Sequence, residues 1–405
     1  MDTKTIVCVR REDCTGCGAC KSICPKGAIF FAQDKEGFPI PQIKEEKCIN
    51  CGLCEKTCPA LHPPVKGLIL EAYAAQILDK KALQDSTSGG LFTVFSREIF
   101  RRGGTVFGCI WDNDYNAVIV RATTEQEMIP MRGSKYVWSN ASDSYQKVKE
   151  DLEAGKPVLF TGTPCQAAGL RNYLRKDYES LYIMDFFCGG APSPVALKAY
   201  VHSLTKHFPQ DKLDLKFRDK DRYGVGVHIT YQQKKGKVFQ GYLQNPYFYS
   251  YHTKVFHRLA CYHCQYRTGE RFEDLTMGDY WGIGQFHKEF DINAGVSALL
   301  VSSDKGRELL DAIKNQLQLV PTEAYNIAVG NNLDIGGLQR EFHVQPFRSG
   351  FLDLCIQDNW EKAERKYIKY NKSRIMMLMK KHVKTKVPGF FRQAKKIKKM
   401  LIKKC

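Results

Sequence analysis

The chain has 405 residues, of which 43% are hydrophobic, and its formal net charge is +18. This length predicts two or three domains with a sizeable core. No apolar run approaches the roughly 18 residues of a membrane span, and the start Met1–Cys8 lacks the apolar core of a signal peptide. Without an export signal, sixteen cysteines indicate reduced thiols and metal ligation, not disulfides. We therefore expect a globular cytoplasmic protein.

The positive charge is concentrated at the C-terminal end. Residues 361–405 hold 17 Lys and Arg against two Glu, a charge of +15, which leaves +3 for the rest of the chain. Within a basic tail at 340–405, the stretch 388–404 predicts an amphipathic helix that can lie peripherally on an anionic membrane at its inner face. A solvated tail and an arm that docks an acidic partner are the alternatives. No nucleic-acid partner is expected, because no recognised reading module accompanies the charge.

Two cysteine runs near the N-terminus carry the most specific signal. Cys14–Pro25 and Cys48–Pro59 both read Cys-x2-Cys-x2-Cys-x3-Cys-Pro, the run that bacterial ferredoxins use for 4Fe-4S clusters. A disulfide framework or zinc knuckles explain the repeated run poorly. The fourth cysteine of each run ligates the other cluster in two-cluster ferredoxins. Residues 1–62 are therefore predicted to form a two-cluster module, with Cys14, Cys17, Cys20 and Cys58 on the first cluster and Cys48, Cys51, Cys54 and Cys24 on the second.

Beyond a linker at 62–67, residues 68–155 and 156–320 alternate strand and helix signals. Apolar residues recur at helical spacing in 91–102, for example, and Gly103-Gly104 ends that pattern. This alternation predicts two α/β units. The expected strands are 71–78, 105–111, 117–122, 157–160, 181–187, 213–218, 227–231 and 296–302, and the expected helices are 91–102, 142–154, 165–174, 195–207 and 304–316.

Three turns in these units are candidates for ligand binding. Ser88-Gly89-Gly90 precedes a helix, whose N-terminal amides suit a phosphate, although a capped helix has the same sequence pattern. Lys135 belongs to a second small-residue turn, which by itself is no more than a surface turn. The turn Gly162–Cys165 directly follows a buried strand, where α/β sheets form their ligand crevice.

Four further cysteines suggest another metal site. Cys261 and Cys264 have ligand spacing, and Cys165 and Cys188 each follow a predicted strand within a small-residue turn. Four such thiolates can hold a third 4Fe-4S cluster. A zinc site and a nucleophilic Cys165 at its helix N-terminus are the alternatives. Cys109 lies on a predicted strand, where core packing explains it.

The body contains seven distinctive short segments, which are Ser86–Phe92, Val106–Gly108, Gly133–Tyr136, Val158–Leu170, Phe217–Lys220, Cys261–Cys264 and Gly278–Gly282. Through these segments, the chain from about Leu68 to Leu310 resembles the family of coenzyme F420 hydrogenase/dehydrogenase beta subunits. That family binds FAD and iron–sulfur clusters and moves electrons between ferredoxin-type clusters and an organic acceptor or donor. The resemblance implies that Ser88, Gly89, Gly90, Lys135, Thr161, Gly162, Thr163 and Pro164 lie around the flavin, and it favours the third cluster.

One segment departs from the family pattern. Glu270-Arg-Phe-Glu-Asp274 stands where the family usually has Arg-x-Gly-Asp, so the acceptor side of the site is less well defined by the resemblance. The family also does not define the substrate, which differs between its members.

These signals together predict an α+β and α/β protein, with a ferredoxin-like two-cluster module, an α/β flavoprotein body and a basic helical tail. The expected function is FAD- and iron–sulfur-dependent oxidoreduction of an F420-like, nicotinamide or polysaccharide-pathway substrate, with ferredoxin or another redox protein as partner. The alternative is a non-enzymatic electron-transfer adapter that docks to a partner reductase or hydrogenase. The sequence nominates no acid–base residue.

Overall fold

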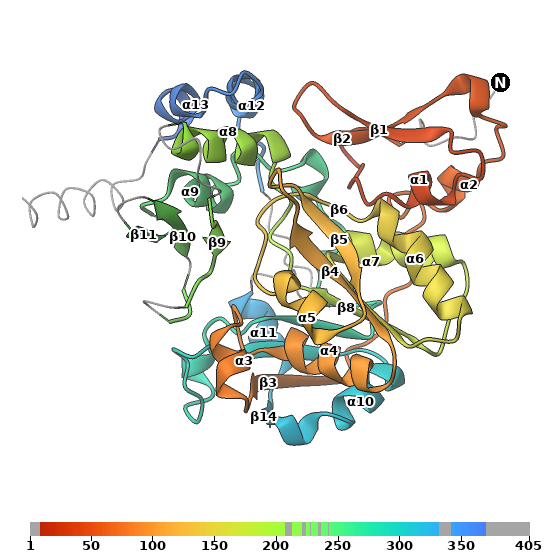
Figure 1. The fold of residues 1–405 in the computed structure, drawn as a ribbon, viewed down its shortest axis with the longest axis vertical. Coiled ribbons are helices and arrows are strands. Elements are labelled where there is room, and N and C mark those ends of the chain that lie inside the picture. The colour runs from red at the N-terminus through yellow and green to blue at the C-terminus, as the bar shows by residue number, and fades with distance from the viewer. Residues whose placement is uncertain are drawn as a thin grey trace, which may run out of the picture.

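The computed structural model describes residues 9–206, 213–220, 224–226, 228–233, 236–241, 243–331 and 342–369. Figure 1 shows a small N-terminal module beside a body built on a large sheet, with a group of helices near both and a smaller sheet on the side away from the module. In the part of the chain that the structure describes, no helix has both the length and the apolarity that crossing a membrane requires.

The N-terminal module is built on short elements around its cysteines. The strands β1 (Ile29–Gln33) and β2 (Pro39–Ile43) form an antiparallel hairpin in which Ile29 faces Ile43. The Asp34 carboxylate accepts hydrogen bonds from the Glu36 and Phe38 amides and thereby shapes the turn. The remaining elements are α1 (Ala19–Ile23), α2 (Leu53–Lys56) and the 3-10 turn η2 (Glu45–Lys47).

The body holds a mixed sheet, of nine strands among the described residues, in the order β14-β3-β13-β12-β8-β7-β4-β5-β6. β4 pairs in parallel with β7, and β3 lies between β13 and β14. The expected units 68–155 and 156–320 therefore contribute strands to the same sheet. The strands are β3 (Glu71–Ile77), β4 (Thr105–Trp111), β5 (Ala117–Ala122), β6 (Ser139–Asn140), β7 (Val158–Gly162), β8 (Leu181–Phe186), β12 (Leu275–Asp279), β13 (Ser297–Val301) and β14 (Leu317–Pro321).

Helices cover both faces of this sheet, which explains why its central strands are continuously apolar. Leu159 of β7 belongs to a core with α4 (Leu91–Arg101) and α10 (Asp304–Asp311). The next residue, Phe160, points to the opposite face and belongs to a core with α6 (Ser142–Glu153) and α7 (Pro164–Leu174). The smaller helical elements are α3 (Lys80–Gln84), α5 (Glu125–Met128), η3 (Ile129–Met131), η5 (Ile283–Gln285), η6 (Lys314–Gln316) and α11 (Ala324–Gly330).

A third group of elements has an aromatic core. Tyr200, Tyr247, Phe256 and Trp360 are fully buried together, with ring centroids 5.0 to 6.3 Å apart. The C-terminal helices of this group belong to the stretch that the sequence treats as a tail; its predicted membrane segment at 388–404 lies outside the described residues. The elements are α8 (Pro194–Thr205), β9 (Lys216–Phe217), β10 (His228–Gln233), β11 (Gly236–Gly241), α9 (Pro246–His252), η4 (Leu259–Cys261), α12 (Arg348–Ile356) and α13 (Trp360–Tyr367).

Candidate iron–sulfur and redox site

The first predicted cysteine set lines one hollow of the N-terminal module. The hollow lies between the loop before α1 and the end of α2, and its empty space, part of it open to solvent, is about 330 Å³. Gly18 precedes α1 with φ +94, and a β-carbon there would lie 2.6 Å from the Ser142 side chain, so only glycine fits. The fold thus brings together the four thiols Cys14, Cys17, Cys20 and Cys58.

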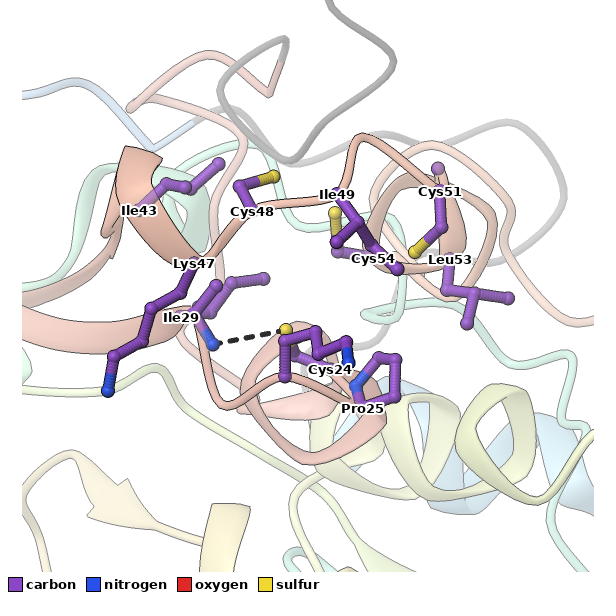
Figure 2. Close-up of a pocket in the computed structure, with 13 residues that line it drawn as sticks. Cys24, Pro25, Ile29, Ile43, Lys47, Cys48, Ile49, Cys51, Leu53 and Cys54 are labelled. Atoms are coloured by element: carbon purple, nitrogen blue, oxygen red, sulfur yellow. Dashed lines mark hydrogen bonds between the residues drawn. The ribbon is translucent and has the colours of Figure 1, made fainter.

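The second set lines a similar hollow of about 370 Å³, shown in Figure 2. Cys24 reaches it from the end of α1, and its sulfur accepts a 3.3 Å hydrogen bond from the Ala28 amide. The other three thiols, Cys48, Cys51 and Cys54, come from the second cysteine run. The exchange of Cys24 and Cys58 between the runs, which the ferredoxin spacing predicts, is therefore present in the geometry.

The two hollows differ in exposure. Cys17, Cys20 and Cys58 of the first are buried, whereas Cys51 of the second is exposed. Burial raises the pKa of the Cys17 and Cys20 thiols. For Cys20, the charges of the nearby cysteines raise the pKa further. Buried thiols close to one another favour a cationic iron centre, because thiolates need compensating positive charge there.

Cys165, Cys188, Cys261 and Cys264 also lie near one another. Cys165 begins α7, Cys188 follows β8, and the other two flank the end of η4. Burial raises the pKa of Cys264 to about 12, and the charges of Cys261 and Cys165 act in the same direction. Burial likewise raises the pKa of Cys188, with contributions from the other three cysteines of this group. The fold therefore gathers all four half-buried cysteines into one group.

Hydrogen-bond donors surround the sulfurs of this third group. The Ala191 amide donates to Cys261 Sγ at 3.3 Å, and the Gly190 amide donates to Cys188 Sγ at 3.4 Å. The Thr163 hydroxyl lies 3.2 Å from Cys165 Sγ. Such donors stabilise thiolate charge. Within the described ranges, no three or more His, Cys, Asp or Glu side chains form a site suited to a single metal ion.

The first and third cysteine groups meet at α7. A β-carbon on Gly169 would lie 3.1 Å from Cys17 Sγ and 2.9 Å from the Tyr145 hydroxyl. That hydroxyl lies 2.9 Å from both the Cys17 and the Gln166 carbonyl oxygens. Cys165 stands one helical turn before Gly169 on α7. The N-terminal module therefore docks with its first cysteine group, which we call the inner group, facing the third cysteine group.

Buried arginines hold the module in this position. Arg258 donates to the Cys14 carbonyl at 3.1 Å and to the Pro39 carbonyl at 2.5 Å, and its guanidinium lies 5.1 Å from the Phe38 ring centroid. Arg348 of α12 pairs with Glu36 at 2.5 Å and donates to the His257 carbonyl at 2.9 Å. These contacts connect the module to the third group of elements as well as to the sheet.

The residues predicted around a flavin occupy the carboxyl edge of the sheet, in two places. Thr161 and Gly162 end β7, and the Thr161 hydroxyl donates to the Phe107 carbonyl at 2.8 Å. Thr163 caps α7, which starts at Pro164. Ser88, Gly89 and Gly90 lie three strands away beside β13, where the Gly89 amide donates to Ser297 Oγ at 2.9 Å.

Two of these predicted flavin residues have structural contacts of their own. A β-carbon on Gly89 would lie 2.2 Å from the Ala75 carbonyl oxygen, so this glycine allows the turn to approach β3. The Lys135 ammonium donates to the carbonyls of residues 130 to 133, at 2.9 to 3.0 Å. Burial lowers the pKa of Lys135 to about 8.

The same edge holds an arginine whose role was not predicted. Arg218 adopts a left-handed φ of +64 just after β9 and pairs with Asp279 at 2.6 Å. Its guanidinium lies 5.2 Å from the Trp281 ring centroid, and the Tyr136 hydroxyl is 3.4 Å from Nη1. Its Nε and Nη2 atoms are buried without a hydrogen-bond partner among the described residues. The segments Phe217–Lys220 and Gly278–Gly282 carried the family resemblance, but sequence alone does not show that they meet.

Lys220 connects this arginine to the Ser88 turn. Its ammonium donates to the carbonyls of Leu83, Ser88 and Ala294 at 2.6 to 2.7 Å. Burial lowers its pKa to about 8, and Asp279 partly counteracts that effect. Two buried cations thus stand over the carboxyl ends of β3 and β12.

Comparison with known proteins finds a match for the N-terminal module and another for much of the body. Residues 13–61 match the "4Fe-4S dicluster domain", and residues 155–325 match the C-terminal part of the beta subunits of "Coenzyme F420 hydrogenase/dehydrogenase". The two matches support a beta subunit of this coenzyme F420 hydrogenase/dehydrogenase type with an N-terminal ferredoxin-type domain. They also support an iron–sulfur electron-transfer role within an oxidoreductase system.

Two individual proteins are similar over most of the chain. One of the subunits of the F(420)H(2) dehydrogenase of Methanosarcina mazei is 20% identical over 343 residues, which cover 79% of this chain and 88% of that protein. A polypeptide in the structure of the F420-reducing [NiFe] hydrogenase complex from Methanosarcina barkeri is 16% identical, covers 75% of this chain and 92% of its own length, and gives a TM-score of 0.43.

Proposed function

We propose that this protein is the flavin- and iron–sulfur-containing oxidoreductase component of a larger redox complex, and that it carries electrons between a partner protein and an organic substrate. The observation that carries the proposal is the contact between Cys17 and α7, because it joins the dicluster module to the third cysteine group. The relative from Methanosarcina mazei, itself one of several dehydrogenase subunits, supports membership of such a complex.

The geometry suggests an order of electron transfer. The second hollow is the outer one, because Cys51 is exposed and the rim carries the exposed Lys26 and Lys47. We infer that a ferredoxin or another redox protein exchanges electrons there. The electrons then pass through the first hollow to the group of Cys165, and from there to the carboxyl edge of the sheet.

The carboxyl edge fits an anionic cofactor such as FAD. Arg218 Nε and Nη2 are buried without partners among the described residues, and a phosphate oxygen would satisfy them. Flavin, when bound, exchanges single electrons with clusters and a hydride with organic substrates. In this proposal Ser88–Gly90, Lys135 and Thr161–Pro164 shape the surrounding wall, and Arg218 binds the acidic group. F420-like, nicotinamide and polysaccharide-pathway substrates are the candidate classes.

The test is anaerobic purification followed by assay of iron, acid-labile sulfide and flavin per chain. About twelve iron atoms, four for each of three clusters, with one FAD would support the proposal. About eight iron atoms without flavin, after reconstitution with iron, sulfide and FAD, would contradict both the third cluster and the flavin. Loss of about four iron atoms in Cys188→Ala would assign the third cluster to its cysteines.

A non-enzymatic electron-transfer adapter is the second candidate. Two residues predicted to contact flavin favour this candidate, because each already has a role within the protein. The Lys135 ammonium has four carbonyl partners, and Gly89 lies against β3. An adapter would carry its clusters but take up no flavin. Flavin content after reconstitution therefore separates the two candidates.

A further inference from the structure

Two carboxyl groups lie side by side in the core near the third cysteine group. Asp185 of β8 has no exposed surface, and Glu273 is 2% exposed. The Glu273 side chain is a hydrogen-bonding neighbour of the Asp185 side chain. The nearest cation is Arg271, itself 2% exposed, whose Nη1 lies 3.2 Å from Asp185 Oδ2. Glu273 stands within the segment that departs from the family's Arg-x-Gly-Asp pattern.

The hydrogen bonds around this pair are incomplete. Asp185 Oδ1 and Glu273 Oε1 are buried without a hydrogen-bond partner in the described part of the chain, and so are Nε and Nη2 of Arg271 and Oγ1 of the neighbouring Thr276. Glu273 Oε2 accepts the Phe272 amide at 3.1 Å. A buried acceptor without a donor is destabilising. A proton held by the carboxyl pair would give the pair a donor of its own.

The charge balance leads to the same conclusion. Two ionised carboxylates against one guanidinium would leave a net negative charge in a dry core, where charges are costly. One retained proton makes the group of three neutral. Burial raises the pKa of both carboxyl groups, and for Glu273 the charge of Asp185 raises it further, while Arg271 opposes the shift.

The other charged groups nearby have partners of their own. On β12 and the segment before it, Asp274 accepts the Ile183 amide at 2.8 Å and the Ser303 hydroxyl at 2.6 Å, and Lys305 lies 3.9 Å from it. On the opposite side, the residues of β7 carry no titratable side chain. Among these groups, Asp185 and Glu273 are therefore the two carboxyl groups left to share a proton.

We propose that Asp185 and Glu273 hold one proton between them and that this carboxyl pair takes up a second proton when the redox centre of the third cysteine group is reduced. The second half rests on the third cluster of the proposed function. Cys188 follows Asp185 by three residues, and the Arg271 guanidinium lies 5.4 Å from the ring centroid of the intervening Phe187. An electron that arrives at the cluster adds negative charge beside the pair and favours protonation.

The step balances in charge and atoms. The cluster gains one electron from a one-electron donor, for which dithionite is the laboratory probe, and the carboxyl pair gains one proton from water. No covalent bond other than O–H forms. On oxidation, the electron leaves to the acceptor and the proton returns to solvent.

Infrared spectroscopy of the oxidised, purified protein tests the shared proton. We expect a C=O band of a protonated carboxyl group that shifts in D2O and disappears in Glu273→Gln. Glutamine keeps the shape of the glutamate side chain and offers Asp185 an N–H donor. Glu98→Gln is the matched control, because buried Glu98 is held as a carboxylate by Arg101 and Arg102 at 2.7 Å. The control should leave the band unchanged. If Glu273→Gln fails to fold, Glu273→Gly, the residue of the family pattern, replaces it.

Redox titration at several pH values tests the coupling. In the wild type, the midpoint potential of the third centre should fall by about 59 mV per pH unit, the value for one proton per electron, and in Glu273→Gln it should be independent of pH. Absence of the band in the wild type would overturn the shared proton, and the same slope in both proteins would overturn the coupling. If iron analysis finds only two clusters, the proposed function fails, and the infrared band alone decides the shared proton.

Discussion

Arg348 in α12 and Glu36 in the β1–β2 turn form an ion pair of 2.5 Å, with both side chains at least 96% buried. Arg11 also pairs with Glu36, and the Ser349 hydroxyl donates to it at 2.7 Å. Because Glu36 belongs to the dicluster module and Arg348 to the C-terminal helices, this one carboxylate holds together segments from the two ends of the described chain.

We expect Glu36→Gln to lower the free energy of unfolding by about 3 kcal/mol, because it leaves the buried Arg348 and the half-buried Arg11 without their counter-charge. Urea denaturation followed by fluorescence measures the change. Glu12→Gln, in the same module, is the control and should stay within about 0.5 kcal/mol of the wild type. Equal stability of Glu36→Gln and the wild type would show that the ion pair does not hold the module.

The same contact predicts a pH dependence. Burial opposes ionisation of Glu36, but hydrogen bonds from Arg348, Ser349 and Arg11 outweigh it and lower the pKa to about 2. Since the pKa in the unfolded chain is about 4.3, the stabilisation is fully present above that value and is lost as the pH falls toward 2. The stability difference between the wild type and Glu36→Gln should therefore be constant near neutral pH and shrink in acid. A difference that shrinks already between pH 8 and 6 would contradict this assignment.

Exchange of the fourth cysteine between the runs predicts which cluster each substitution removes. Cys24→Ala should remove the outer cluster, lined by Cys51, and leave the inner one, although Cys24 belongs to the first run. Cys58→Ala should do the reverse. Electron paramagnetic resonance of the reduced proteins, with iron analysis, distinguishes the two. Cys109→Ala is the control, because Cys109 lines neither hollow, and it should keep the full iron content.

The contact at Gly169 predicts a steric effect on electron transfer. Its β-carbon would lie 2.9 Å from the Tyr145 hydroxyl and 3.1 Å from Cys17 Sγ, so Gly169→Ala must displace the inner cysteine group and should cost about 1 to 3 kcal/mol. Electrons from dithionite should still reach the module, but the third centre should be reduced more slowly. Stopped-flow absorbance measures both phases. Gly284→Ala, whose β-carbon meets its nearest neighbour at 3.9 Å, should change neither.

Spacing along the chain was sufficient to predict the two cysteine sets, because the ligands of each run are close in sequence and the exchange of the fourth ligand is a property of the run. Most of the helices and strands that the sequence predicts also lie within two residues of observed ones, for example the strand at 105–111 and the helix at 142–154. Local periodicity determines such elements.

Contacts between residues that are far apart in the sequence could not be predicted in this way, because they depend on the order of the strands in the sheet. The strand order brings β4 beside β7 and β3 beside β13, so units that look separate along the chain share one sheet. Lys135 lies in a turn that fits a ligand equally well, and only the fold reveals that its ammonium meets four carbonyls of its own loop. The pairing of Arg218 with Asp279 likewise depends on where β9 lies relative to β12.

The Arg348–Glu36 contact has a consequence for the order of events during synthesis. The dicluster module leaves the ribosome first, whereas α12 emerges more than 300 residues later. Until then Glu36 has no Arg348 to bind, although α7 and Arg258, which contact the module, have already been made. The ion pair that holds the module to the C-terminal helices is therefore among the last contacts of the described chain that can form.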